Sequence, residues 1–188
     1  VGSGRNSCVL HYRDNNAELK DGDLLLIDAG CEYRYYASDI TRTLPVSGRY
    51  SPEQRAVYEI VLEAQRAAIG KVRAGNHWNE PHDAAVRAIT HGLVKLGLLK
   101  GKPASLIRDS AYKPFFMHRT GHWLGMDVHD VGDYKVDGEW RVLEPGMVTT
   151  VEPGIYIPAG MPRVARKWWN IGVRIEDDVV VTRGAPEV

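Results

Sequence analysis

Cysteine is scarce in this sequence. Only Cys8 and Cys31 occur among 188 residues, and both lie in apolar surroundings, so no disulfide framework of the kind that stabilises small secreted proteins is predicted. Two such cysteines are typical of a reducing compartment, and no basic segment followed by an apolar one opens the sequence as a secretory leader would. We therefore expect a cytoplasmic protein.

Long apolar runs and an excess of charge are also lacking. The longest runs, such as residues 24–27, are far too short to span a bilayer. The 24 basic residues balance the 24 acidic residues, so the net charge gives no attraction for nucleic acid or for an anionic membrane. We expect neither as a partner. With 44% hydrophobic and 26% charged residues, the composition is that of a folded globular chain.

The order of the expected elements is strands, two helices, then strands. Ser51, Pro52 and Gln54 form a strong helix start, because serine caps, proline suits the first helical position and glutamine can complete a capping box. A second helix is expected over residues 81–96. Strands are expected over residues 8–12, 23–31, 35–44, 116–124, 148–156 and 171–182. This order predicts an α+β fold with a largely antiparallel sheet.

Four carboxylates interrupt segments that should be apolar. They are Asp28, Asp39, Glu152 and Glu176. Burying an ionised carboxylate without a partner costs roughly several kcal/mol of folding free energy. Each of the four therefore needs a cation or must become neutral. For any single acid, pairing with an arginine or capping of a turn is a sufficient explanation, and Arg42 and Arg174 could neutralise two of the four. Four together indicate a further cation.

The segment MHRTGHWLGMDVHD, residues 117–130, carries three histidines, His118, His122 and His129. Three metal ligands, one ligand with two substrate groups, and a polar turn are the alternatives. One imidazole added to four carboxylates favours a hard divalent ion such as Mn²⁺ over a zinc site rich in cysteine. Several carboxylates can bridge two ions about 3.5–4 Å apart, which predicts a dinuclear hydrolase.

Five motifs then resemble those of a known family. In order they are LLLIDAGCEY, SDITRTLPVSG, HWLGMDVHDVG, LEPGMVTTVEPGIY and IGVRIEDD. The sequence resembles the Xaa-Pro aminopeptidases (aminopeptidase P) over residues 1 to about 181. They belong to the wider group that shares the pita-bread fold with prolidases and methionine aminopeptidases.

The resemblance implies an α+β pita-bread fold with two pseudo-twofold halves and a curved, largely antiparallel sheet. It also implies that the helix and strand that precede the Gly2 region in the family are missing, together with the separate N-terminal domain of longer members. Residues 1–188 are therefore expected to be a metallopeptidase catalytic domain that is truncated at its N-terminus.

The resemblance also implies the metal site. Asp28 would chelate one ion, Asp39 and Glu176 would bridge the pair, and His122 and Glu152 would complete the other ion. The cofactors would be two divalent ions, with Mn²⁺ expected and Co²⁺ or Zn²⁺ as alternatives.

The remaining roles follow from matched positions. Glu152 is expected to shuttle protons, and His118 and His129 to stabilise the carbonyl oxyanion. His11, Arg174 and Tyr156 are expected to bind substrate.

The implied function is that of an exopeptidase. A hydroxide that bridges two ions would hydrolyse the bond between an N-terminal residue and a following proline, and the partners would be peptides with proline at the second position. A homo-oligomer is left open. The alternatives are a prolidase that cleaves Xaa-Pro dipeptides, and an inactive pita-bread module used for binding.

Overall fold

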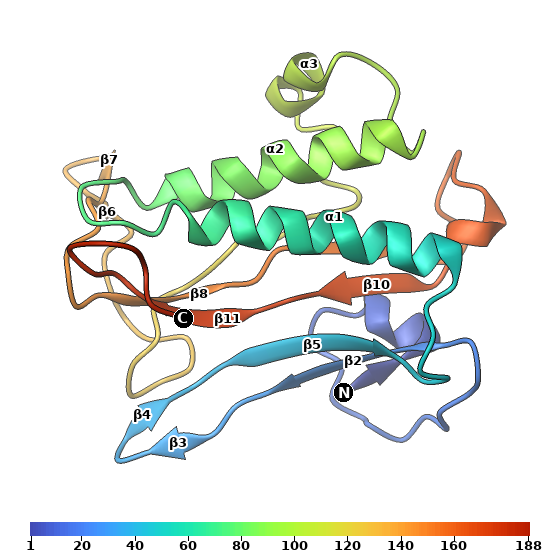
Figure 1. The fold of residues 1–188 in the computed structure, drawn as a ribbon, viewed down its shortest axis with the longest axis horizontal. Coiled ribbons are helices and arrows are strands. Elements are labelled where there is room, and N and C mark those ends of the chain that lie inside the picture. The colour runs from blue at the N-terminus through green and yellow to red at the C-terminus, as the bar shows by residue number, and fades with distance from the viewer.

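The computed structural model describes all residues, 1–188. Two long helices, α1 and α2, lie side by side over one face of the strands, and the two termini lie on the strand side (Figure 1). In chain order the elements are β1 (Gly2–Ser3), η1 (Gly4–Cys8), β2 (Leu24–Ala29), β3 (Glu32–Tyr33), β4 (Tyr36–Ala37), β5 (Ile40–Pro45), α1 (Pro52–Ile69), α2 (Asn79–Lys95), α3 (Pro103–Arg108), β6 (Lys135–Val136), β7 (Glu139–Trp140), β8 (Val148–Val151), β9 (Gly154–Ile157), η2 (Arg166–Trp168), β10 (Ile171–Arg174) and β11 (Asp177–Val180).

Every strand pair is antiparallel, which confirms the expected α+β class. β2 lies between β1 and β5, β8 pairs with β11, and β9 pairs with β10. The β2–β5 pair and the β8–β11 pair are joined through a single bridge between Thr41 and Glu176. None of the helices is both long and apolar enough to cross a membrane.

Helix α1 begins where the sequence predicts. Ser51 caps it, and Gln54 completes the capping box by accepting a hydrogen bond from the Ser51 N–H. Its apolar stripe is buried against the sheet and α2, as the helical spacing requires. The buried residues of this stripe are Val57, Ile60, Val61, Ala64 and Ala68.

Two of the expected strands do not form. Residues 8–12 contain the end of the 3-10 helix η1 and a turn. Residues 116–124 run antiparallel to β8 but make only one β-bridge, Trp123 with Thr149. The ladder is incomplete because the His122 N–H donates to the Thr150 side chain instead of a main-chain carbonyl. The His122 carbonyl still accepts from the Thr150 N–H at 3.0 Å, in addition to Thr149 Oγ1.

Gly121 explains how closely this segment approaches β8. A Cβ atom at Gly121 would lie 2.1 Å from the Thr150 carbonyl oxygen, which no side chain permits. The backbones of residues 120–124 and β8 can therefore lie in contact, and His122 and Glu152 are brought to the same side.

Three of the expected strands are interrupted. Residues 35–44 form β4 and β5, residues 148–156 form β8 and most of β9, and residues 171–182 contain β10 and β11. Asp39, Glu152 and Glu176 lie in these three interruptions, and Asp28 lies in β2, next to its last residue. The short helix α3 was not expected, because six residues give little periodic signal.

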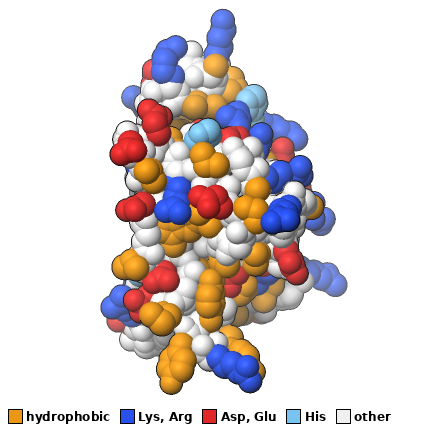
Figure 2. Space-filling view, turned by 90° about the vertical axis from the view of Figure 1, so that its left-hand side faces the viewer, with side chains coloured by type: hydrophobic (Ala, Val, Ile, Leu, Met, Phe, Trp, Pro, Cys, Tyr) orange, Lys and Arg blue, Asp and Glu red, His pale blue; other side chains and the backbone are white.

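The hairpin of β3 and β4 projects from the body of the molecule at the lower left of Figure 1. Its tip exposes Tyr33 and Tyr35, and the Arg34 guanidinium lies 5.2 Å from the centroid of the Tyr33 ring. Figure 2 shows the side of the molecule that lies at the left of Figure 1. Hydrophobic side chains gather at its lower end, while acidic and basic side chains are mixed over the rest. The mixture agrees with the balanced charge of the sequence.

His82 connects α2 to the segment that carries His122. Its Nδ1 lies 2.8 Å from Thr120 Oγ1, and its ring packs against Phe116. Burial, with a smaller contribution from the nearby positive charge of Arg119, lowers the pKa of His82 to about 3. The ring is therefore neutral in the folded protein at neutral pH.

Acidification should destabilise the fold through His82. Because its folded-state pKa lies below the ordinary value of 6.5, the contribution is complete above pH 6.5 and is lost as the pH falls towards 3. Between pH 7.5 and 5, His82→Gln should lose about 1–2 kcal/mol less unfolding free energy than the parent protein. Urea unfolding at several pH values measures this, with the exposed His77→Gln as control. Parallel pH profiles for parent and His82→Gln would contradict the assignment.

Gly92 marks the closest contact between α1 and α2. A Cβ atom there would lie 2.6 Å from Ile60 Cγ1 and Cγ2. Gly92→Ala should therefore destabilise the protein by about 1–3 kcal/mol, although alanine is favoured in a helix by about 1 kcal/mol. Ile60→Ala removes both of these γ carbons, so Gly92→Ala should cost less in an Ile60→Ala background than in the parent, and thermal unfolding of the single and double variants measures the difference. An increase in stability for Gly92→Ala alone would show that the helices can separate freely.

Candidate metal centre and active site

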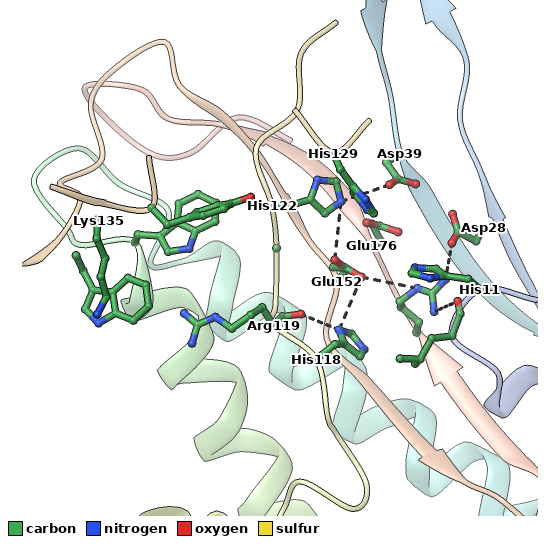
Figure 3. A pocket seen from close by; sticks show the side chains of 16 residues that line it. His11, Asp28, Asp39, His118, Arg119, His122, His129, Lys135, Glu152 and Glu176 are labelled. Atoms are coloured by element: carbon green, nitrogen blue, oxygen red, sulfur yellow. Dashed lines mark hydrogen bonds and ion pairs between the residues drawn. The ribbon is translucent and has the colours of Figure 1, made fainter. Parts of the chain in front are cut away.

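Five side chains predicted as metal ligands converge at one end of a cavity. Three overlapping groups have ligand atoms within 4.8 Å of one another. The sets are Asp39, His122 and His129; His122, Glu152 and Glu176; and Asp28, Asp39 and Glu176. Figure 3 shows these side chains pointing toward one another from separate strands and loops.

The β2–β5 pair and the interruption between β10 and β11 position three carboxylates. Asp28 on β2 lies opposite Thr41 on β5. Thr41 Oγ1 donates to Glu176 Oε2 at 2.6 Å, and the Glu176 N–H donates to the Thr41 carbonyl at 3.1 Å. The Asp39 N–H donates to Asp178 Oδ2 at 3.1 Å, so the backbone on either side of the site is fixed by hydrogen bonds.

His122 has the tautomer that a metal ligand requires. Its Nδ1 lies 2.9 Å from the Trp123 carbonyl oxygen and must donate to it, because a carbonyl only accepts. In the metal-free protein burial opposes protonation of His122, but its hydrogen bonds to Asp39 and to the Trp123 carbonyl raise its pKa. When the ring is neutral, Nε2 carries the lone pair that a metal ion could take. It faces Asp39 Oδ2 at 3.5 Å and Glu152 Oε1 at 3.9 Å.

The site concentrates negative charge in a poorly hydrated place. Glu176 is only 1% exposed, and burial followed by the nearby charges of Glu152 and Asp39 raises its pKa to about 9. Burial likewise raises the pKa of Glu152 to about 7. These carboxylates resist ionisation because the site offers them too little positive charge.

Two further carboxylates have opposite shifts. Burial raises the pKa of Asp28, although Arg174 Nη2 lies 2.5 Å from its Oδ2. Burial would also raise the pKa of Asp39, but hydrogen bonds with His122 and Asp28 lower it.

The donor set fits divalent metal ions. Four carboxylates and one imidazole nitrogen supply oxygen-rich ligation with too little positive charge of its own. Hard divalent cations prefer this combination, and carboxylates can bridge two of them.

Beside the ligands, a chain of hydrogen bonds connects Asp28 to His118. Arg174 donates to Asp28 through Nη2 and to the Tyr156 hydroxyl through Nη1 at 3.2 Å. The Tyr156 hydroxyl lies 2.9 Å from His118 Nε2, and His118 Nδ1 lies 2.7 Å from the Arg119 carbonyl oxygen. Nδ1 must be the donor, so Tyr156 donates to Nε2. Burial lowers the pKa of His118 to about 4, which keeps its ring neutral.

The other predicted site residues lie where substrate can reach them. His129 packs edge-on against His122, with ring centroids 4.3 Å apart, and His11 lies 6.3 Å from His129. Neither makes a hydrogen bond within the protein. Arg174 pairs with Asp28, one of the four acids, as the sequence suggested, although Asp28 is exposed and not buried as its apolar surroundings predicted. Arg42 instead pairs with Asp177 and with the Glu176 carbonyl.

The cavity has a volume of about 740 Å³ and extends well beyond the predicted residues. Sequence patterns did not indicate the aromatic and basic residues that line its other end, which are Trp78, Arg119, Tyr134, Lys135 and Trp140. They come from a helix start, a loop and a short hairpin, so no single motif contains them. Thr41, which orients Glu176, was also missed, and its place beside Arg42 in SDITRTLPVSG gave no signal.

Comparison with known proteins agrees with this geometry. The profile of metallopeptidase family M24 matches residues 1–183. The Xaa-Pro aminopeptidase of Escherichia coli is 54% identical over 187 residues, covering 100% of this chain and 42% of the relative. That of Haemophilus influenzae is 53% identical over 182 residues, with 97% and 42% covered. The chain thus spans about two-fifths of the length of these curated relatives.

Two solved structures have the same fold. The aminopeptidase PepP of Pseudomonas aeruginosa gives a TM-score of 0.98 at 67% identity, covering 100% of this chain and 42% of that one. Aminopeptidase P of E. coli with the inhibitor Pro-Leu gives 0.94 at 53% identity, with 99% and 42% covered. The family match, the shared pita-bread fold and the converging ligands lead to one conclusion: this chain belongs to metallopeptidase family M24.

Proposed function

We propose that the protein is an exopeptidase that hydrolyses the bond between an N-terminal residue and a following proline, and that residues 1–188 act as its catalytic domain. The observation that carries the proposal is the convergence of Asp28, Asp39, His122, Glu152 and Glu176 within overlapping groups of ligand atoms. The names of the similar proteins, Xaa-Pro aminopeptidase and aminopeptidase P, support the substrate class.

The cofactor in this proposal is a pair of divalent ions, with Mn²⁺ first because of the carboxylate-rich donor set. When bound, such ions supply a water nucleophile at neutral pH and polarise the scissile carbonyl. Asp39 and Glu176 belong to two ligand groups each, which suits bridging carboxylates. Cytoplasmic location and homo-oligomerisation remain expectations from the sequence.

Glu152 is the proposed proton carrier. Its Oε2 lies 3.9 Å from His118 Nδ1 and 4.0 Å from Arg174 Nε. Burial raises the pKa of Glu152 to about 7 in the metal-free protein, although the positive charge of Arg174 acts to lower it. A carboxylate can then accept a proton as the bond to water forms and deliver it to the leaving proline nitrogen.

The histidines divide the remaining work. His129 makes no hydrogen bond within the protein and lies against His122, so it can donate to the developing carbonyl oxyanion. Both nitrogens of His118 are engaged. Its ring is therefore proposed to form the wall beside the proline, where Arg174 and Tyr156 hold its orientation. His11 lines the opposite side of the cavity.

The length of the cavity favours an aminopeptidase over a dipeptidase. Arg174, the cation closest to the ligands, already serves Asp28 and Tyr156, so it is poorly placed to receive a carboxylate on the proline itself. The cavity continues past His118 to Trp140, which leaves room for residues that follow the proline.

Metal binding should stabilise the fold by relieving the buried charge. At about 100 times the dissociation constant, a bound ion adds about 2.7 kcal/mol, which raises the thermal midpoint by roughly 5–10 °C for a chain of this size. Glu176→Gln should unfold no earlier than the parent without metal, because a raised pKa marks an unfavourable charge, but should lose most of the gain with Mn²⁺. Exposed Glu59→Gln serves as control. An equal rise of the thermal midpoint with Mn²⁺ in Glu176→Gln and in the parent would show that Glu176 is not a ligand of the metal site.

Activity tests the reaction directly. Protein loaded with Mn²⁺ should release alanine from Ala-Pro-Ala much faster than from Ala-Pro. Glu152→Gln should lower kcat by about 10²–10⁴-fold while keeping bound metal, whereas the exposed His91→Gln should change neither. Turnover of the dipeptide alone would make the protein a prolidase. Metal binding without turnover of either peptide would favour a binding module.

A further inference from the structure

The end of the cavity farthest from the carboxylates is cationic and aromatic. Arg119, Lys135 and Trp140 line it together, and Figure 3 shows Lys135 well removed from Asp28 and Asp39, with the Arg119 side chain directed towards the aromatic rings. The reaction proposed above does not use these residues.

The side-chain cations of Arg119 and Lys135 both lie over the indole ring of Trp140. Lys135 and Trp140 are directly opposite each other in the β6–β7 pair, and Lys135 Nζ lies 4.5 Å from the ring centroid. Arg119 Cζ lies 5.0 Å from the same centroid. Neither cation takes part in any ion pair of the protein, and no side-chain hydrogen bond holds either head group. Burial lowers the pKa of Arg119, and the carboxylate of Asp83 is near enough to act against this shift, but it forms no ion pair with Arg119. Both head groups therefore remain available to bind an anion.

The hairpin that carries Lys135 and Trp140 is held on a buried base. The ring centroid of Tyr134 lies 4.8 Å from that of Trp78. It lies 5.9 Å from that of Trp123, and the Tyr134 and Trp123 ring planes are 4° apart. Trp78 and Trp123 are each only 8% exposed. The Trp78 N–H donates to the Arg141 carbonyl, which fixes the chain directly after Trp140. Lys135 and the Trp140 ring that both cations contact therefore project from a fixed support.

The opposite side of the ligands has the reverse charge. A second hollow, of about 540 Å³, shares His11, Asp28, Asp39 and His129 with the main cavity and adds Glu32 and Asp127, but contains no lysine or arginine. A peptide substrate has the same polarity, with an amine at one end and a carboxylate at the other. The N-terminal residue is thus matched to the acidic side, and the downstream residues to the cationic side.

We propose that Arg119 and Lys135 bind a carboxylate on the C-terminal side of the substrate's proline. This rests on the proposed function. The carboxylate is either the C-terminal carboxylate of a short peptide or the side chain of an aspartate or glutamate in a longer one. Trp140 positions both cations, and because the contact is remote from the reacting bond, it lowers KM more than it raises kcat.

Four peptides separate the two sources of carboxylate. They are Ala-Pro-Ala as free acid and as amide, and Ala-Pro-Glu-amide and Ala-Pro-Gln-amide. In the parent protein loaded with Mn²⁺, kcat/KM should be about three- to tenfold higher for each peptide that carries a carboxylate than for its uncharged partner, mainly through KM. A preference within only one pair identifies which carboxylate is bound, and supports the proposal with that source.

The double variant Arg119→Gln, Lys135→Gln should reduce that preference to nearly one while leaving turnover of the two uncharged peptides within about twofold. The matched control Lys100→Gln removes an exposed cation from elsewhere on the surface and should keep the preference. Equal kcat/KM values within both pairs in the parent, acid against amide and Glu against Gln, would overturn the proposal. So would a double variant that slows all four peptides equally, because that result indicates a structural role.

Binding distinguishes failure of this inference from failure of the proposed function. Dissociation constants for the same four peptides are measured on Glu152→Gln protein loaded with Mn²⁺, from tryptophan fluorescence. If the parent cleaves none of them, the proposed function fails. A carboxylate preference in binding that Arg119→Gln, Lys135→Gln abolishes would still support the cationic subsite, and binding without such a preference would overturn it.

Discussion

Mutual repulsion among buried carboxylates is the constraint on which the site depends. Glu176 is almost completely buried. Its carboxylate lies within 4.8 Å of ligand atoms of Asp28 and Asp39 in one group and of Glu152 in another. Arg174 pairs with Asp28 and approaches Glu152, but one guanidinium cannot balance four acids. The folded chain tolerates this arrangement because Thr41 and Arg174 satisfy part of its hydrogen-bonding capacity, and because cations can supply the rest. The metal-free fold thus carries unfavourable charge that bound divalent ions would relieve.

The interruptions in the strands deliver these ligands. In a continuous antiparallel strand, successive side chains point to opposite faces of the sheet. The carboxylates of several such strands would then lie at unrelated positions along their strands and would not converge. Asp39, Glu152 and Glu176 lie in short breaks, where the chain changes direction between two paired segments. The same breaks separate β8 from β9 and β10 from β11, so each half of a predicted strand pairs with a different partner. The cost of lost ladder bonds is limited because backbone groups at the breaks bond across the site, as Glu176 does with Thr41.

The sequence indicated which acids and which histidine come together more completely than it indicated the geometry around them, and their role as metal ligands stays a prediction. Acids within apolar runs stand out, since burial without a cation is unfavourable, and ordered motifs supplied the one histidine. Helix α1 was equally clear because its cap and its stripe agree. The segment around Gly121 was misread as a strand, because apolar alternation cannot reveal that the Thr150 side chain accepts the hydrogen bond of the His122 N–H. Arg119 and Lys135 carried no signal, since a cation on a loop and a cation on a two-residue strand ordinarily face solvent.

Gly121 has a consequence for which metals the protein can use. Its contact with the Thr150 carbonyl means that main-chain atoms, which cannot be shortened or extended, set the separation between the segments that bear His122 and Glu152. Ions of different radius must then be accommodated by rotation of carboxylate side chains around a backbone frame of fixed width. Such a frame would discriminate weakly among divalent ions of similar size, so the supply of metals in the surroundings, together with the number of oxygen donors, would govern which ion the proposed site takes.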